Sequence, residues 1–244
     1  MTVSRGGFAA VLWLIASVTA FLTSLATVTL LAHYFLVERP EKSARAQEQE
    51  SETMSEIFAT PEPPEPPPEA GAFTDGRDGA TYKTAKIGGK TWLAENLRYR
   101  TDKSWCYDDD TSYCGKYGRL YGWETAKTAC PTGWRLPTRL DWLALTEAAG
   151  GQEAAGKRLK AKAGWDEDGN GSDSRGFSAL PGGSRHRDAG DFGYAGAIGF
   201  WWTATEYENG GDAYIQTMKY DDDDVGESYG AKGGGMSVRC VRND

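Results

Sequence analysis

The first part of the chain contains an apolar run that does not suit a globular domain. Residues 6–37 include no Asp, Glu, Lys or Arg and read GGFAAVLWLIASVTAFLTSLATVTLLAHYFLV. A helix needs about 20 apolar residues to cross the hydrocarbon core of a bilayer. A cleavable signal peptide has an apolar region of only about 7–15 residues, and a helix at the edge of a soluble core usually has a polar face. The sequence therefore predicts a cytoplasmic tip and an uncleaved transmembrane anchor over residues 1–37.

A segment of different composition follows the anchor. Residues 38–74 are rich in Glu, Pro, Ala and Ser, and they include the stretch PEPPEPPPE. Such a segment has too few apolar side chains to form a core, and its prolines favour an extended polyproline II conformation. We expect a disordered linker over residues 38–74, with a Pro-rich ligand for a partner domain as the alternative. The globular domain is then expected over residues 75–244.

The cysteines indicate the compartment of this domain. They are Cys106, Cys114, Cys130 and Cys240. No two have the CxxC spacing of a zinc site, and an even set without that spacing is typical of disulfides, which persist in oxidising compartments. Basic residues lie on both sides of the apolar run, so charge does not set its orientation. We expect a single-pass cell-membrane protein whose C-terminal domain lies outside the cytoplasm, in the periplasm or at the cell surface.

The net charge limits the partners of the chain. It is −8 at pH 7, which disfavours association with nucleic acid or with anionic lipid headgroups. The run Asp221–Asp224 contributes to this charge, and acidic runs of this kind are typical of solvated loops. We predict no nucleic-acid partner, and contact with the membrane only through the N-terminal helix.

Local patterns predict both helices and strands in the domain. The segment TYKTAKIGGKTWL alternates around Gly88-Gly89, which is typical of a β-hairpin. Helices are predicted over residues 123–128 and 154–162, and between them from Thr138 to the Gly150-Gly151 pair. Loops and short strands are predicted after these helices, because Gly, Asp and Ser are frequent there.

Two of these elements carry more specific expectations. Thr138 and Asp141 have the spacing of a capping box at the start of the middle helix. The side chains that this helix is expected to bury are Leu140, Trp142, Leu143 and Ala144. The last predicted strand, MSVRCVR, alternates its side chains between two faces. Val238, Cys240 and Arg242 are expected on one face, and Ser237, Arg239 and Val241 on the other.

Several separated motifs resemble one known family. They are TYKTAKIGGKTWLAENLRY, SWCYDDD, CGKYGRLYGW, CPTGWRLPTRLDW, FSALPGGSR, FWWTATEY and SVRCVR, spread over residues 80–242. Their order resembles that of the Fibrobacter succinogenes major paralogous domain. That family is in turn similar to the C-type lectin-like fold, in the branch shared with formylglycine-generating enzymes and with the variable proteins of diversity-generating retroelements. The resemblance implies an α+β domain of the C-type lectin-like fold.

The resemblance also bears on the cysteines and on catalysis. It implies a bridge between Cys130 and Cys240, and a bridge between Cys106 and Cys114 would close a short loop around YDDDTSY. Formylglycine-generating oxidases hold copper with two cysteines in the C-terminal half of the domain, where this chain has only Cys240. Related sulfoxide synthases need a histidine cluster, and this chain has two histidines. We therefore predict that the chain is not an enzyme.

The stretch WDEDGNGSDSRGF contains an incomplete calcium-loop pattern. Asp166, Asp168 and Asn170 occupy the first, third and fifth positions of a loop resembling an EF-hand. Its twelfth position is Phe177, where a bidentate Glu is required. The candidate calcium ligands are Asp166, Asp168, Asn170 and Asp173, and an acidic surface turn is the alternative.

Tyrosines and short polar residues are concentrated near residues 185–229. Rigid aromatic side chains among short polar groups are typical of recognition surfaces. The candidate ligand-binding residues are Arg185, His186, Asp191, Tyr194, Tyr207, Tyr214, Tyr220, Asp222 and Tyr229. In retroelement-diversified proteins of similar fold this region carries the variable binding residues. The alternative is that Trp201, Trp202 and some tyrosines form the core.

The sequence thus predicts a membrane-anchored binding protein for a protein or glycan ligand. A diversity-generating retroelement would account for variable loops in such a protein. A modifying enzyme of the formylglycine-generating type and a structural component of a surface assembly are the alternatives.

Overall fold

The computed structural model describes residues 70–243 and, before them, residues 24, 25, 27–34, 36, 45 and 49. The chain divides into two units, Met1–Glu65 and Pro66–Asp244. Within the described residues, no helix has both the length and the apolar character needed to cross a bilayer. Most of the predicted anchor and of the predicted linker lies outside the described residues.

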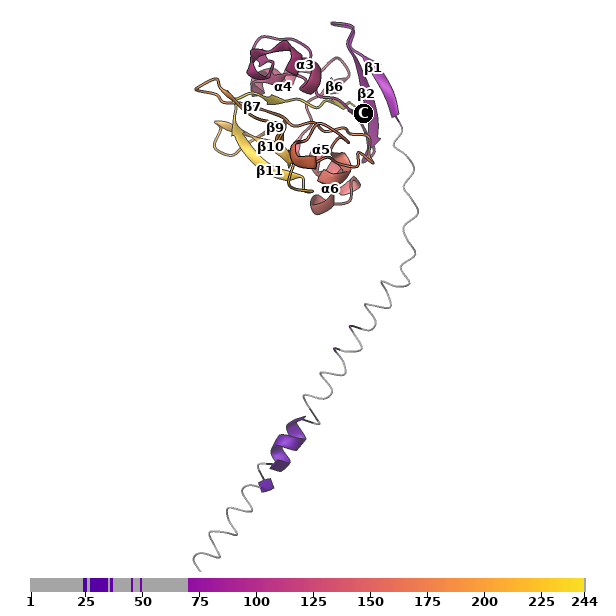
Figure 1. Cartoon of the computed structure of the whole chain (residues 1–244), viewed down its shortest axis with the longest axis vertical. Coiled ribbons are helices and arrows are strands. Elements are labelled where there is room, and N and C mark those ends of the chain that lie inside the picture. The colour runs from indigo at the N-terminus through magenta and orange to yellow at the C-terminus, as the bar shows by residue number, and fades with distance from the viewer. Residues whose placement is uncertain are drawn as a thin grey trace, which may run out of the picture. The chain divides into compact units, whose positions relative to one another are not determined.

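The second unit contains two β-sheets (Figure 1). The first has the order β1 (Ala70–Thr74), β2 (Thr81–Ile87), β3 (Lys90–Leu93), β13 (Val241–Arg242) and β6 (Trp134–Arg135). The second has the order β11 (Gly226–Ala231), β10 (Asp212–Lys219), β9 (Ile198–Glu206), β12 (Met236–Ser237), β5 (Leu120–Tyr121) and β4 (Ser104–Trp105). A further strand, β7 (Gly182–Arg185), pairs with β9 and with β8 (Phe192–Ala195).

Short helices complete an α+β architecture. They are α3 (Thr111–Tyr117), α4 (Trp123–Ala129), α5 (Arg139–Ala148), α6 (Gln152–Leu159), and the 3-10 helices η2 (Tyr107–Asp109) and η3 (Asp166–Asp168). Helix α5 packs against α6, β9 and β10, and α4 packs against β9. Figure 1 shows α3 and α4 at one end of the unit and α5 and α6 at the other. The helix predicted over residues 123–128 and the hairpin around Gly88-Gly89 are confirmed, whereas α3 was not predicted.

The fold begins earlier than the sequence predicts. Residues 70–74 belong to the predicted linker, but they form β1, which pairs with β2. Ala70 lies opposite Ala85 at one end of the pairing, and Thr74 lies opposite Thr81 at the other. The Phe73 ring lies 5.1 Å from that of Trp134. This aromatic contact and the backbone pairing give a small-residue segment enough partners to join the sheet.

The capping box at the start of α5 and the burial of Trp142 are confirmed, but the predicted burial of Leu140, Leu143 and Ala144 is wrong. Leu140 and Leu143 are 71% and 55% exposed, and Ala144 is also exposed. The helix buries Trp142, Leu145 and, just after its end, Ala149. Residues three and four positions apart share one face of a helix, so Trp142, Leu145 and Ala149 form the buried face. Leu140 and Leu143, which are also three positions apart, lie on the face that is exposed to solvent.

The second half contains strands longer than the short strands and loops that were predicted for it. Strand β9 has nine residues and β10 has eight. Trp201 and Trp202 are fully buried and belong to two different core clusters. Successive side chains of a strand point to opposite faces, so these two tryptophans fill the core on both sides of β9. Aromatic side chains therefore supply the apolar area that aliphatic residues supply in most sheets.

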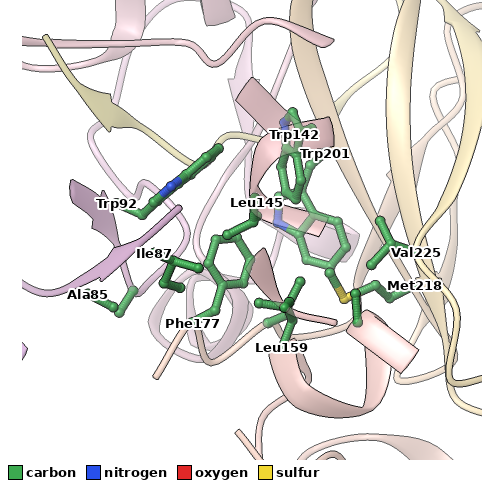
Figure 2. Packing of buried hydrophobic residues seen from close by; sticks show 14 of the residues in the cluster. Ala85, Ile87, Trp92, Trp142, Leu145, Leu159, Phe177, Trp201, Met218 and Val225 are labelled. Atoms are coloured by element: carbon green, nitrogen blue, oxygen red, sulfur yellow. The ribbon is translucent and has the colours of Figure 1, made fainter. Parts of the chain in front are cut away.

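Figure 2 shows the first core cluster, in which large rings gather around Leu145. The ring centroids of Trp142 lie 5.5 Å from Trp92, 5.7 Å from Phe177 and 6.0 Å from Trp201. Tilted and edge-on aromatic pairs at these distances add to the stabilisation that comes from burial alone.

The C-terminal segment alternates as predicted, but both of its faces are buried. Val238 and Cys240 belong to the second core cluster, and Val241 belongs to the first. The segment is divided between β12, which pairs with β5 and β9, and β13, which pairs with β3 and β6. These residues therefore join the two sheets.

Arg239 lies fully buried in this segment. Its guanidinium donates hydrogen bonds to the carbonyl of Leu93 at 3.1 Å, to the carbonyl of Phe177, and to Oδ1 of Asn96 at 2.9 Å. It also lies 4.2 Å from the centroid of the Phe177 ring. Burial lowers the pKa of Arg239 to about 9, so the group remains protonated at neutral pH.

Both disulfides are present. Cys130 is bonded to Cys240 and Cys106 to Cys114. The first joins the end of α4 to the C-terminal segment, and the second closes a loop that contains η2.

Loss of the Asp141 carboxylate is expected to make stability less sensitive to acid between pH 4 and pH 2. Burial by itself raises the pKa of Asp141, but hydrogen bonds from Arg135 and Thr138 outweigh it and lower the pKa from 3.8 to about 2. A carboxyl group with a lowered pKa stabilises the fold above its unfolded pKa, and this contribution is lost as the pH falls through the folded value. The shift corresponds to about 2 kcal/mol.

Urea unfolding of Asp141→Asn should therefore show a loss of about 2 kcal/mol at pH 7 that nearly disappears at pH 2. Glu124→Gln is the matched control, because Glu124 is exposed and pairs with Lys127 on the surface of α4. Its stability should follow that of the wild type at each pH. Parallel pH profiles for Asp141→Asn and the wild type would contradict the assignment.

Candidate functional site

An open pocket of about 720 Å³ lies beside the hairpin formed by β7 and β8. We call it the hairpin pocket. Four predicted ligand-binding residues line it: Arg185, His186, Asp191 and Tyr194. It is also lined by residues that the sequence analysis did not single out, among them Arg187, Asp188, Phe192 and Asp212. A pocket of this size is within the range of small-molecule sites.

The turn between β7 and β8 is held by His186. The backbone N–H of His186 donates to the Asp191 carbonyl at 2.8 Å, and the N–H groups of Asp188 and Ala189 both donate to its Nδ1 at 3.4 Å. Because Nδ1 accepts these bonds, the hydrogen-bond network assigns the proton of the neutral ring to Nε2. His186 thus has a structural role in the turn and keeps one donor for a ligand.

Arg185 is held in a defined position at the base of the hairpin. Its guanidinium lies 4.4 Å from the centroid of the Trp105 ring and 5.9 Å from that of Phe192. Its backbone pairs with Gly235 through two hydrogen bonds of 2.9 Å. Gly190 has a φ of 74°, which favours glycine, and a Cβ there would lie 2.7 Å from Nη2 of Arg185 and displace the guanidinium.

The loop between Cys106 and Cys114 packs against the hairpin formed by β7 and β8. The Tyr107 ring lies 5.4 Å from that of Phe192 and 5.2 Å from that of Tyr113. Burial raises the pKa of Tyr107, which keeps the phenol neutral. The short disulfide therefore helps to position the aromatic groups behind the pocket.

Tyr194 has an unusual backbone conformation for a tyrosine. Its φ is 71°, and its side chain is 61% exposed. Its ring makes an edge contact with Phe200, with centroids 5.9 Å apart. A residue other than glycine in this region costs about 1–3 kcal/mol, and such strain is often found at binding sites. The hairpin thus presents an aromatic ring at the pocket.

Tyr207, Tyr214 and Tyr229 form one cluster on the surface, which we call the tyrosine cluster. The rings of Tyr207 and Tyr229 are stacked with centroids 4.3 Å apart, and Tyr214 meets Tyr207 edge-on at 5.1 Å. Tyr214 and Tyr229 are direct neighbours across β10 and β11. Arg139 at the start of α5 lies 4.9 Å above the Tyr214 ring.

The tyrosine cluster and the hairpin pocket are connected through Asp212. The backbone N–H of Tyr207 donates to the Asp212 carbonyl at 3.0 Å, and Asp212 also lines the pocket. Partial burial and the neighbouring Tyr229 raise the pKa of Tyr207, so its hydroxyl stays a hydrogen-bond donor at neutral pH. The two features thus adjoin the same residue, Asp212.

Comparison with known families assigns the domain. The sequence model described as the Fibrobacter succinogenes major domain matches residues 85–242. The chain belongs to this family. Both disulfides, the hairpin pocket and the tyrosine cluster of this Fibrobacter succinogenes major domain lie within the matched residues. No curated protein and no solved structure matches the chain, so these comparisons supply the family and not a ligand.

Two predicted residues lie elsewhere in the Fibrobacter succinogenes major domain. Tyr220 and Asp222 follow β10, at the opposite end of the strand from Asp212. Nζ of the buried Lys160 donates to the carbonyls of Lys219 at 3.0 Å and Asp222 at 2.7 Å. These two residues therefore lie away from the hairpin pocket. The turn that follows β10 is hydrogen-bonded to Lys160, directly after the end of α6.

The calcium prediction is not supported by the arrangement of its candidate ligands. In the part of the chain that the structure describes, no three His, Cys, Asp or Glu side chains come close enough to hold a metal ion. Oδ1 of Asn170 accepts a hydrogen bond from the Trp165 backbone at 3.1 Å, and Asp173 accepts bonds from Ser178 at 2.7 and 2.6 Å. Asp166 lies instead against Gly196, and Asp168 ends η3. The segment folds as an acidic turn that these internal contacts hold.

The residues that support the site from distant parts of the sequence were not predicted. Trp105 and Tyr107 lie about 80 residues before the hairpin in the chain, yet they contact Arg185 and Phe192. The available signal was the motif SWCYDDD, which places one aromatic residue on each side of a disulfide cysteine.

Proposed function

We propose that this chain is a binding protein that recognises a protein or glycan ligand with the hairpin pocket and the tyrosine cluster. The observation that carries the proposal is that the predicted binding residues gather in two groups that both adjoin Asp212. Four predicted binding residues line one pocket, three form one partly exposed aromatic cluster, and Asp212 connects them. Rigid aromatic groups beside polar side chains provide contact area at a low cost in conformational entropy.

The proposal places this domain outside the cytoplasm on a membrane anchor. Two disulfides support an oxidising compartment. The charge-free run of residues 6–37 supports the anchor. A C-type lectin-like fold is part of the same proposal, supported by the capped helix α5 directly after WRLPT and by the buried strand segment SVRCVR.

Binding accounts for the site better than catalysis of the formylglycine-generating type. All four cysteines of the chain are in disulfides, so none is a thiolate for copper. The hairpin pocket has one histidine, whose Nδ1 is engaged in the turn. Stoichiometric copper in the purified protein would overturn this conclusion. Diversification by a retroelement would leave adenine-rich codons between residues 185 and 239 and a template repeat nearby.

Removal of the three rings of the tyrosine cluster is expected to weaken ligand binding at least tenfold. The full chain would be screened on protein and glycan arrays, and the affinity for any ligand found would be measured for Tyr207→Ala/Tyr214→Ala/Tyr229→Ala. Loss of stacked aromatic contacts at the centre of an interface costs about 2 kcal/mol or more. Tyr220→Phe is the control, because Tyr220 lies apart from the site and the change keeps its ring. Unchanged affinity in a folded triple variant would contradict the site.

A further inference from the structure

Arg185 differs from the neighbouring arginine of the hairpin pocket in its charge environment. Arg187 pairs with Asp188, with Nε and Oδ2 3.1 Å apart. Within residues 70–243, no carboxylate lies within ion-pair distance of the Arg185 guanidinium, which stacks instead on Trp105. The pocket therefore contains a cation whose hydrogen-bond donors are available to a ligand.

The geometry around Arg185 prepares it to bind a planar anion. Hydrogen bonds to Gly235 fix its backbone, two aromatic rings flank its guanidinium, and Gly190 leaves room for Nη2. A guanidinium matches the two oxygens of a carboxylate with two parallel hydrogen bonds. Because the side chain is already ordered, binding loses little additional conformational entropy.

The rest of the pocket lining suits hydroxyl groups. Asp191 and Asp212 line it as hydrogen-bond acceptors, and His186 keeps its Nε2 proton as a donor. Three carboxylates near the pocket, those of Asp188, Asp191 and Asp212, would repel a ligand with several negative charges. One free cation among several acceptors instead matches a ligand with a single acidic group and many hydroxyls. The exposed Tyr194 ring adds an apolar face against which a sugar ring can pack.

We propose that the hairpin pocket binds a saccharide unit that carries a carboxylate, such as a uronic acid. The carboxylate is held by Arg185, and the hydroxyls donate to Asp191 and Asp212. The volume of about 720 Å³ accommodates a short oligosaccharide. The inference rests on the proposed function and names the ligand class for the same site.

Calorimetric titration of the full chain with two matched probes tests this inference. The probes are galacturonic acid, which has a single carboxylate, and its methyl ester, which has the same hydroxyls and no charge. We expect the acid to bind the wild type at least tenfold more tightly than the ester. Arg185→Gln should weaken binding of the acid at least tenfold and leave binding of the ester within threefold, because charge-assisted hydrogen bonds are lost only with the acid.

Arg242→Gln is the matched control, because Arg242 is exposed and does not line the pocket. It should change the affinity for the acid less than threefold. Arg185→Lys keeps the charge but not the paired donors, and an intermediate affinity is expected. If Arg185→Gln lowers the melting temperature, the comparison of acid and ester on the wild type still decides the point.

Equal affinity for acid and ester, equal effects of the two arginine substitutions, or no binding of either probe would overturn the inference. Tighter binding of a Glu-rich peptide than of the saccharide acid would also overturn it. The proposed function would stand in each case if the arrays identify another ligand that depends on the tyrosine cluster. The absence of any ligand on the arrays would instead overturn the proposed function itself.

Discussion

Replacement of Arg239 by methionine is expected to lower the free energy of unfolding by about 3–5 kcal/mol. The guanidinium donates to the carbonyls of Leu93 and Phe177 and to the side chain of Asn96, all within the core. The carbonyls of Leu93 and Phe177 each lose a donor at a cost of about 1–3 kcal/mol, and the stacking on Phe177 is lost as well. Oδ1 of Asn96 keeps the hydrogen bond from Nε1 of Trp201 at 2.9 Å. Burial of the Arg239 charge is itself unfavourable, as its lowered pKa shows, and the removal of this cost offsets part of the loss.

Urea unfolding at pH 7 measures this effect. Arg242→Met is the matched control, because Arg242 belongs to the same C-terminal segment but is exposed. Its stability should stay within about 0.5 kcal/mol of the wild type. An Arg239→Met chain as stable as the wild type would show that the core tolerates unpaired carbonyls at this position.

Loss of the Cys130–Cys240 bridge is expected to lower the free energy of unfolding by about 4–5 kcal/mol. The cysteines are 110 residues apart. A bridge between them lowers the conformational entropy of the unfolded chain, and this stabilises the folded state more when the closed loop is longer. Cys106 and Cys114 are 8 residues apart, so the corresponding loss is about 2–3 kcal/mol. Double alanine variants of each pair, compared by urea unfolding under identical conditions, provide the measurement.

The two variants should also differ in ligand binding. Loss of the short bridge is expected to weaken binding, because the loop that it closes supports Phe192 of the hairpin pocket through Tyr107. Loss of the long bridge should leave binding by the folded fraction unchanged. A greater loss of stability from the short bridge than from the long one would contradict the loop-entropy argument.

Local signals allowed much of the fold to be predicted. Gly88-Gly89 marks a hairpin, and Thr138 with Asp141 marks a helix start, because each of these depends on residues close together in the chain. Strand β1 has the small-residue composition of the linker before it, and its pairing with β2 cannot be deduced from that composition.

The parts that were missed depend on contacts between distant residues. Helix α5 has apolar side chains on both faces, and its packing against β9 and β10 decides that Trp142 is buried and Leu143 is not. The candidate site shows the same limit. Tyr214 and Tyr220 are close in sequence, but they belong to different ends of β10. Trp105 reaches the site from a strand near the start of the domain.

The position of the joining segment in the chain has a consequence for biosynthesis. Residues 236–242 leave the ribosome after every strand with which they pair, including β3, more than 140 residues earlier. Until they emerge, one sheet lacks β12, the other lacks β13, and Cys130 lacks its disulfide partner. The nascent domain therefore stays open through most of its translation, and contacts between residues so far apart also slow folding. Under the location outside the cytoplasm that we propose, the chain would cross the membrane in this state, before it folds.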